Sequence, residues 1–292
     1  MTPTRVIGVP IDSVGRSGGT ELAPAALRDL GIVEALDAVD GGDLEVRVRG
    51  SERDSETGII ASDDVLGATS AIRESVAGAL GSGERPLLAG GCCAELPGAL
   101  AGARDALGRV GLAYLDGHLD LYDGVTSPTG EAADMPVGVA LGLGPRAWVE
   151  AAGGSTVDPA DTALIGFRDK EESLAYGMLQ PEDLDPEPIQ LSVEEVRAEG
   201  PEAASRRVAD ALSARPFWLH LDVDVLDQDV FAATDYLMGG GMTWDELAAS
   251  LGPLAASPAL AGASIACYNP EKDPGRRCGR GLVDALRTAF AG

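Results

Sequence analysis

The chain has 292 residues, 45% of them hydrophobic and 24% charged, which is ordinary usage for a globular protein. Its net charge of −25 argues against binding to nucleic acid or to an anionic membrane, because like charges repel. No stretch approaches the ~18 continuous apolar residues of a membrane span, and residues 1–5 show no signal-peptide pattern. We therefore expect a cytoplasmic protein whose four cysteines are reduced.

Short β-branched runs alternate with segments rich in alanine, leucine and glutamate. The runs predict eight strands, at residues 5–9, 44–48, 86–89, 110–115, 162–166, 189–192, 216–223 and 261–266. The other segments predict helices at residues 23–30, 62–80, 94–106, 193–214, 243–256 and 281–290. Because strands that alternate with helices are joined by crossovers, we expect an α/β protein with a parallel sheet covered on both faces. No repeat or linker interrupts this order, so we expect a single domain over residues 1–292.

Two clusters of aspartate and histidine come at the ends of predicted strands. They read Asp116-Gly-His118-Leu-Asp120 and His220-Leu-Asp222-Val-Asp224. Alternate residues of an extended chain point to the same side, and sites in open parallel sheets gather at the carboxyl ends of strands. Several carboxylates that are buried together at the end of a strand repel one another, and their burial costs free energy unless a cation binds between them. Carboxylates with one imidazole suit Mn²⁺, Fe²⁺ or Zn²⁺.

A third predicted strand ends in a glycine pair followed by two cysteines, Gly90-Gly91-Cys92-Cys93. The glycines permit a tight turn that would present Cys93 at the same edge of the sheet, where a thiolate is a good metal ligand. Taken singly, each motif has an ordinary alternative, a solvated loop for the aspartates and buried packing for the cysteines. Their joint position after three buried strands favours a metal site.

These motifs resemble the arginase and agmatinase family, the ureohydrolases. Asp116-Gly-His118-Leu-Asp120 resembles the family's Asp-Ala-His-X-Asp, and Asp222-Val-Asp224-Val-Leu-Asp227 resembles its Asp-Val-Asp-X-X-Asp. Gly90-Gly91-Cys92-Cys93 stands where the family has Gly-Gly-Asp-His, and the similarity runs nearly from end to end. The resemblance implies an arginase-like three-layer α/β/α sandwich with a mostly parallel eight-stranded sheet.

The resemblance also implies a site for two divalent metal ions, Mn²⁺ foremost. Cys93 replaces a histidine ligand, as in an atypical branch of the family, which makes Zn²⁺ or Fe²⁺ more competitive. The implied ligands are Cys93, Asp116, His118, Asp120, Asp222 and Asp224. A hydroxide shared by the metals would attack the carbon of an amidine, hydroxyguanidine or amide, and Asp120 would pass a proton to the leaving nitrogen. Family members are often trimers or hexamers, so we expect a homo-oligomer with a small-molecule substrate.

The motifs that would contact substrate depart from the family pattern. In the loop at residues 129–136, Ala133 stands where the family has a catalytic histidine, and Glu131 where it has a substrate-binding asparagine. Cys267 replaces the glutamate that grips a guanidinium group, which needs a facing carboxylate for charge-assisted hydrogen bonds. We therefore expect a substrate other than plain arginine. The candidate substrate contacts are Thr126, Glu131, Glu171 and Cys267.

His220 has three interpretations. It is a hydrogen-bonded core histidine, a residue that orients a metal ligand, or a catalytic acid–base group that replaces the missing histidine. The same losses leave open an alternative for the whole protein, a catalytically impaired homologue with a structural or regulatory role. The retained ligands favour an enzyme, because unused charged groups are costly to keep buried.

Overall fold

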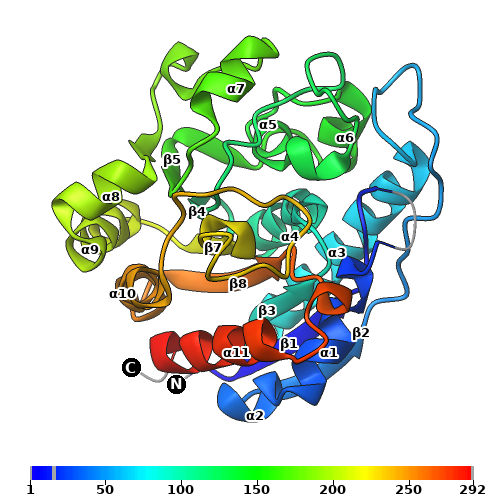
Figure 1. Cartoon of the computed structure of the whole chain (residues 1–292). Helices are drawn as coiled ribbons and strands as arrows, with labels where there is room; N and C mark the ends of the chain where they lie inside the picture. The colour runs from blue at the N-terminus through cyan, green and yellow to red at the C-terminus, as the bar shows by residue number, and fades with distance from the viewer. Residues whose placement is uncertain (1, 15–17, 291–292) are drawn as a thin grey trace.

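The computed structural model describes residues 2–14 and 18–290, and its strands form one sheet (Figure 1). The strands are β1 (Thr4–Val9), β2 (Val39–Asp43), β3 (Arg85–Gly90), β4 (Val110–Leu115), β5 (Val157–Ile165), β6 (Ile189–Leu191), β7 (Phe217–Asp222) and β8 (Leu260–Ala266). Their order across the sheet is β2-β1-β3-β8-β7-β4-β5-β6, and each neighbouring pair is parallel. The α/β class and the eight-stranded sheet are thus confirmed, and the described strands are all parallel.

Helices cover both faces of this sheet (Figure 1). They are α1 (Ala23–Asp29), α2 (Ile32–Ala35), α3 (Ser62–Gly81), α4 (Leu96–Leu107), α5 (Pro136–Ala140), α6 (Arg146–Ala151), α7 (Lys170–Ala175), α8 (Val193–Glu199), α9 (Pro201–Leu212), α10 (Trp244–Ala255) and α11 (Arg277–Phe290). Helices α3 to α6 pack on one face, and α1, α2 and α8 to α11 pack on the other. The predicted three-layer sandwich is confirmed. In the part of the chain that the structure describes, no helix is both long and apolar enough to cross a bilayer.

The hydrophobic core lies in two layers, one on each side of the sheet. Successive residues of a strand point to opposite faces, so Leu87 of β3 packs beneath the layer of α1 and α11 while Leu88 packs beneath α3 and α4. A strand that is buried on both faces reads as a continuous apolar run. This is why the sequence located β3 and β4 nearly to the residue.

The strand predicted at residues 44–48 is wrong, because the strand there is β2, at Val39–Asp43. All five residues of β2 are exposed at the edge of the sheet and two of them are glycine, so hydrophobic patterning carries no signal for it. Its position is set by pairing with β1, where Arg5 lies opposite Val39. Arg28 of α1 adds ion pairs to Asp40 and Asp43.

The single helix predicted at residues 193–214 is also wrong. It is two helices, because Gly200 ends α8 at a φ of 93° and Pro201 begins α9. Proline has no N–H with which to continue the hydrogen bonds of a preceding helix. The last helix begins at Arg277 rather than at residue 281, and four short helices (α2, α5, α6 and α7) were not predicted.

Candidate metal centre

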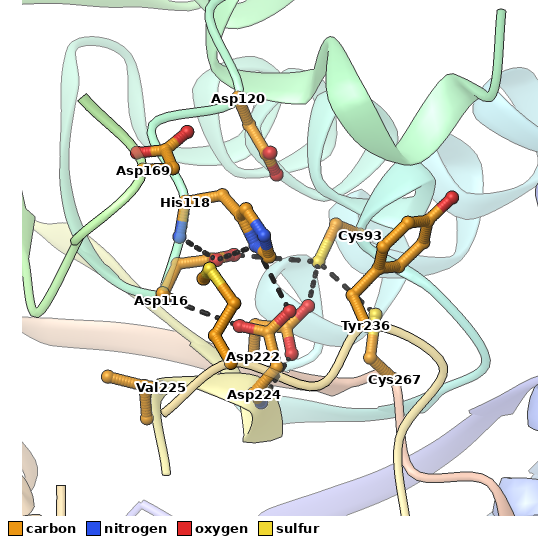
Figure 2. A network of polar contacts seen from close by, with 12 residues as sticks. Cys93, Asp116, His118, Asp120, Asp169, Asp222, Asp224, Val225, Tyr236 and Cys267 are labelled. Atoms are coloured by element: carbon orange, nitrogen blue, oxygen red, sulfur yellow. Dashed lines mark hydrogen bonds and ion pairs between the residues drawn. The ribbon is translucent and has the colours of Figure 1, made fainter. Parts of the chain in front are cut away.

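Residues from the carboxyl ends of four strands meet at one edge of the sheet. β3 leads to Cys93, β4 leads to Asp116, β7 ends at Asp222, and β8 is followed by Cys267. β3, β8, β7 and β4 are consecutive in a parallel sheet, so their carboxyl ends lie side by side. Figure 2 shows these side chains directed towards a common centre.

One part of the centre is a set of nitrogen and oxygen donors. The Nδ1 atom of His118 lies 3.1 Å from Oδ2 of Asp224 and 3.4 Å from Oδ1 of Asp116. Backbone N–H groups of the turn after β4 fix both carboxylates: that of Gly117 donates to Asp224 at 3.1 Å, and that of His118 donates to Asp116 at 2.7 Å. Donor atoms of Asp116, His118 and Asp224 all lie within 4.8 Å of one another, close enough to share one ion.

The other part of the centre is rich in sulfur. The Cys93 thiol donates to Oδ2 of Asp222 at 2.8 Å, and its sulfur lies 3.7 Å from Sγ of Cys267. Donor atoms of these three residues again lie within 4.8 Å of one another. The two sets adjoin, because Cys93 Sγ lies 3.8 Å from Oδ2 of Asp116, and the backbone N–H of Asp224 donates to Oδ1 of Asp222 at 2.7 Å.

Burial and mutual repulsion make this centre bind protons strongly. Burial, followed by the charge of Asp224, raises the pKa of Asp116 to about 7. The same two causes raise the pKa of Asp222 well above its usual range. Burial opposes protonation of His118, yet the facing carboxylates of Asp224 and Asp116 raise its pKa well above the usual value. Burial also raises the pKa of the Cys93 thiol.

These donors fit divalent metal ions. Hard carboxylates, imidazoles and thiols form three overlapping groups of donors. Besides the two sets above, Cys93, Asp116 and His220 also lie within 4.8 Å of one another. Divalent ions supply the positive charge that protons supply otherwise, which resolves the repulsion between buried carboxylates. The residues predicted as ligands are brought together here, with Asp120 set apart from the two sets.

Asp120 lies beside the two donor sets and lines the cavity next to them (Figure 2). Its backbone has a φ of 49°, an uncommon conformation for a residue with a side chain, which turns the chain after the motif. The buried hydroxyl of Tyr114 donates a hydrogen bond to its carboxylate. Burial, and then the charge of Asp116, raises the pKa of Asp120 well above its usual range, so it holds a proton readily.

His220 is fully buried beneath Cys93 and does not line the cavity. Its ring stacks on Tyr114, with 4.9 Å between ring centroids, and burial lowers its pKa to about 3, so the imidazole is neutral. The indole N–H of Trp218 donates to Ser264 Oγ at 2.9 Å, and this oxygen lies 2.7 Å from Nδ1 of His220. We assign the tautomer in which Nδ1 accepts from the Ser264 hydroxyl, because among the described contacts Nδ1 is the acceptor within reach of that hydroxyl. The Nε2–H, 3.3 Å from Cys93 Sγ, then points at the sulfur. This geometry favours the interpretation that His220 orients a ligand.

A cavity of about 250 Å³ opens beside the centre. Its walls include six acidic residues: Asp120, Asp134, Asp169, Glu172, Asp222 and Asp224. Tyr236, Leu237 and Met238 form part of its lining, and Tyr236 packs edge-on against His118 with 6.1 Å between centroids. Among the described residues that line the cavity, none is lysine or arginine.

The four predicted substrate contacts differ in their position relative to the cavity. Cys267 lines the cavity. Glu131 accepts a hydrogen bond of 2.8 Å from the Tyr236 hydroxyl, which places it next to the lining. Thr126 is bonded to Asp123 in its own loop, and Glu171 is exposed on α7; neither belongs to the described lining, so both stay predictions.

Sequence reasoning missed several residues of the site. Asp169 follows β5, and the rule that sites gather at strand ends would have found it. Asp134 ends a short 3-10 helix inside the segment 129–136, which the resemblance had marked, although not this residue. Tyr236 lies on a loop whose path depends on packing, and no local signal marks it. Glu95, fully buried two residues after Cys93, was not singled out either; among the described residues no group donates a hydrogen bond to its carboxylate, and burial raises its pKa.

Comparison with known proteins agrees with this geometry. The family model described as the arginase family matches residues 3–291. The arginase of Bacillus caldovelox is 28% identical, over 99% of this chain and 98% of that protein. Its crystal structure at pH 5.6 superposes with a TM-score of 0.88 at 25% identity, over 100% of this chain and 99% of that one. The formimidoylglutamase of Bacillus subtilis shares the fold, with a TM-score of 0.76 at 18% identity over 100% and 87% of the two chains. The chain, which carries the family's two aspartate motifs at adjoining strand ends, belongs to the arginase family.

Proposed function

We propose that this protein is a hydrolase that uses two divalent metal ions, Mn²⁺ foremost, to cleave a carbon–nitrogen bond in a small amidine, hydroxyguanidine or amide. The observation that carries the proposal is the meeting of buried carboxylates, an imidazole and thiols in the wall of a cavity of about 250 Å³. Membership of the arginase family supports it, because relatives matched over almost the whole chain are arginases.

When bound, two adjacent divalent ions polarise a substrate and lower the pKa of water, so that hydroxide is available near neutral pH. The role of the protein is to hold the donor atoms in place before the substrate binds. Asp116 and Asp222 lie where the two donor sets adjoin, and backbone N–H groups fix one oxygen of each. A site that is built in advance loses little free energy to reorganisation during the reaction.

Asp120 is the group best placed to move a proton. Its carboxylate is held by the Tyr114 hydroxyl and lines the cavity, and burial, followed by the charge of Asp116, raises its pKa, which favours uptake of a proton. In this role Asp120 accepts the proton released when water attacks and delivers it to the leaving nitrogen, which must be protonated to depart as a neutral amine or ammonia.

The cavity favours a positively charged substrate. Asp134, Asp169 and Glu172 line it outside the donor sets, and among its described lining residues none is lysine or arginine, so a cationic amidine or guanidine derivative is favoured over an anionic substrate. The fold leaves the substrate open, because proteins named arginase and formimidoylglutamase both share it. Cys267 has no charge with which to grip a guanidinium ion in the way that a glutamate does.

The alternative, a catalytically impaired homologue, gains no support from the site. The ligand side chains adjoin one another and all but Asp116 line the cavity, and Asp120 keeps a hydrogen bond that fixes its orientation. Buried carboxylates without a cation are destabilising, and a protein that bound no metal would gain by losing them.

Turnover of a substrate panel tests the proposal. Protein loaded with Mn²⁺ is incubated with arginine, agmatine, an N-hydroxyguanidine, a formimidoyl amine and a neutral amide, and the released amine or ammonia is measured together with urea, hydroxyurea or formamide. We expect turnover of at least one cationic member, lost on chelation and restored by metal. Full metal occupancy without turnover of any member would contradict the proposal and favour the impaired alternative.

A further inference from the structure

Cys267 has a left-handed backbone conformation, which is uncommon for a residue with a side chain. It follows β8, its backbone φ is 68°, and its N–H donates to the carbonyl of Gly91 at 2.8 Å. That hydrogen bond joins the chain after β8 to the turn after β3, which carries Cys93. A left-handed backbone is unfavourable for a residue with a side chain and persists where the surrounding structure holds it. The result is that two cysteines distant in sequence face each other in the lining of one cavity.

The two sulfurs are spaced as ligands of one ion. Cys93 Sγ lies 3.7 Å from Cys267 Sγ. Two thiolates bound tetrahedrally to a zinc ion at ~2.3 Å each lie about 3.8 Å apart. A disulfide requires the sulfurs to be separated by about 2.05 Å, so the spacing here is that of two separate thiols.

Two of the three donor groups around the centre differ in chemistry, while the third, Cys93, Asp116 and His220, joins them. Cys93, Cys267 and Asp222 supply two sulfurs and an oxygen to one position. A second group supplies only nitrogen and oxygen to the other position, from Asp116, His118 and Asp224. Soft sulfur ligands select zinc and other thiophilic metals, whereas carboxylate oxygens suit manganese.

We propose that the two positions take different ions, with Cys267 as a direct metal ligand. The sulfur-rich position, formed by Cys93, Cys267 and Asp222, binds Zn²⁺, and the position formed by Asp116, His118 and Asp224 binds Mn²⁺. A role of this mixed-metal centre in catalysis rests on the proposed function. It assigns Cys267 to the metal rather than to the substrate.

His220 supports a thiolate at the sulfur-rich position. The chain of hydrogen bonds from Trp218 through Ser264 leaves the Nε2–H of His220 directed at the Cys93 sulfur, at 3.3 Å. A hydrogen-bond donor behind the sulfur fixes its orientation and offsets part of its negative charge. Partners of this kind behind a ligand raise metal affinity and hold the geometry of the site.

Cobalt substitution tests the ligand assignment without any measurement of activity. The protein is stripped with a chelator and loaded with Co²⁺, whose charge-transfer absorption in the near ultraviolet reports bound thiolates. We expect the band of the unmodified protein to fall by about half in Cys267→Ser and in Cys93→Ser. Cys278→Ser, which removes a partly buried cysteine near the start of α11, is the matched control and leaves the band unchanged. An unchanged band in Cys267→Ser would overturn the proposal.

Competition between metals tests the mixed centre. The stripped protein is equilibrated with one equivalent of Zn²⁺ and an excess of Mn²⁺, desalted, and its metal content is measured by elemental analysis. Because zinc binds most sites more tightly than manganese, zinc is limited to one equivalent per chain and manganese is in excess. We then expect one zinc and one manganese per chain, and a loss of zinc in Cys267→Ser; two manganese ions and no zinc would overturn the proposal. If the sulfur band behaves as expected while no substrate is turned over, the ligand assignment stands and the hydrolase function fails. If substrate is turned over but the band is unchanged in Cys267→Ser, the hydrolase function stands and the ligand assignment fails.

Discussion

At the scale of single residues, the centre depends on carboxylates that would repel one another without a cation. Asp116, Asp222 and Asp224 are each almost fully buried, and His118 lies between Asp116 and Asp224. The guanidinium group of Arg168, which donates to the backbone carbonyl of Asp224 at 2.7 Å, adds a second positive charge nearby. Short backbone hydrogen bonds prevent these carboxylates from turning away from one another. The protein therefore accepts a local cost in stability that bound metal removes.

Removal of one shared carboxylate should abolish metal binding. Asp222 lies where the two donor sets adjoin, so Asp222→Ala takes a ligand from the sulfur-rich position and disturbs the other. We expect metal affinity to fall more than about 100-fold, since even residues behind a ligand are worth that much. Elemental analysis after dialysis measures it. Asp229→Ala, an exposed aspartate of the same segment, is the control. Full metal content in Asp222→Ala would contradict the assignment.

Asp120 should matter for the rate more than for metal. Asp120→Asn keeps the shape of the side chain but takes away its ability to carry a proton, so we expect kcat on the active substrate to fall roughly 10²- to 10⁴-fold. Elemental analysis of the same variant should show both metals retained, because the carboxylate lies outside the two donor sets. An unchanged kcat would remove Asp120 from the mechanism.

At the scale of elements, the sequence located those whose position is set by burial. The strands that lead to the centre are buried on both faces and carry continuous apolar runs, so their ends, and Cys93, Asp116 and Asp222 with them, could be placed in advance. The exposed β2 gave no such signal. The loop with Tyr236 could not be placed either, because its path depends on packing against His118.

The turn after β3 should tolerate no side chain at Gly91. A Cβ there would lie 1.7 Å from the carbonyl oxygen of Ile11, a contact that requires the backbone to move. We expect Gly91→Ala to lower the free energy of unfolding by about 2 kcal/mol or more and to weaken metal binding through Cys93. Urea unfolding measures the first effect.

Gly67→Ala is the matched control for that variant. Gly67 lies on the exposed face of α3, and a Cβ added there would meet no neighbouring atom within 4 Å, so alanine should add about 0.5–1 kcal/mol to stability. Gly91→Ala as stable as the unmodified protein would show that the turn is not tightly held.

At the scale of the whole molecule, metal binding should reverse the effect of pH on stability. Burial and the charge of Asp224 raise the pKa of Asp116 to about 7, so the native metal-free protein keeps a proton that the unfolded chain releases near pH 3.8. That stability is lost as the pH rises through 7. His118, with a raised pKa, acts in the same direction. His220, whose pKa is lowered to about 3, opposes this only below its ordinary pKa of 6.5.

Between pH 6.5 and 8 we therefore expect the metal-free protein to lose on the order of 1–2 kcal/mol of stability as the pH rises. With saturating metal the change should have the opposite sign, because protons compete less with metal at higher pH. Urea titrations at several pH values, with metal and with chelator, measure both. The same slope under both conditions would mean that the buried carboxylates do not bind metal.

The most direct test of the account is a crystal structure of the protein grown with both Zn²⁺ and Mn²⁺, with anomalous scattering recorded at the absorption edge of each metal. We expect a zinc peak among Cys93, Cys267 and Asp222 and a manganese peak among Asp116, His118 and Asp224. Crystals that bind neither metal among these side chains would contradict the claim that the strand ends form a metal centre.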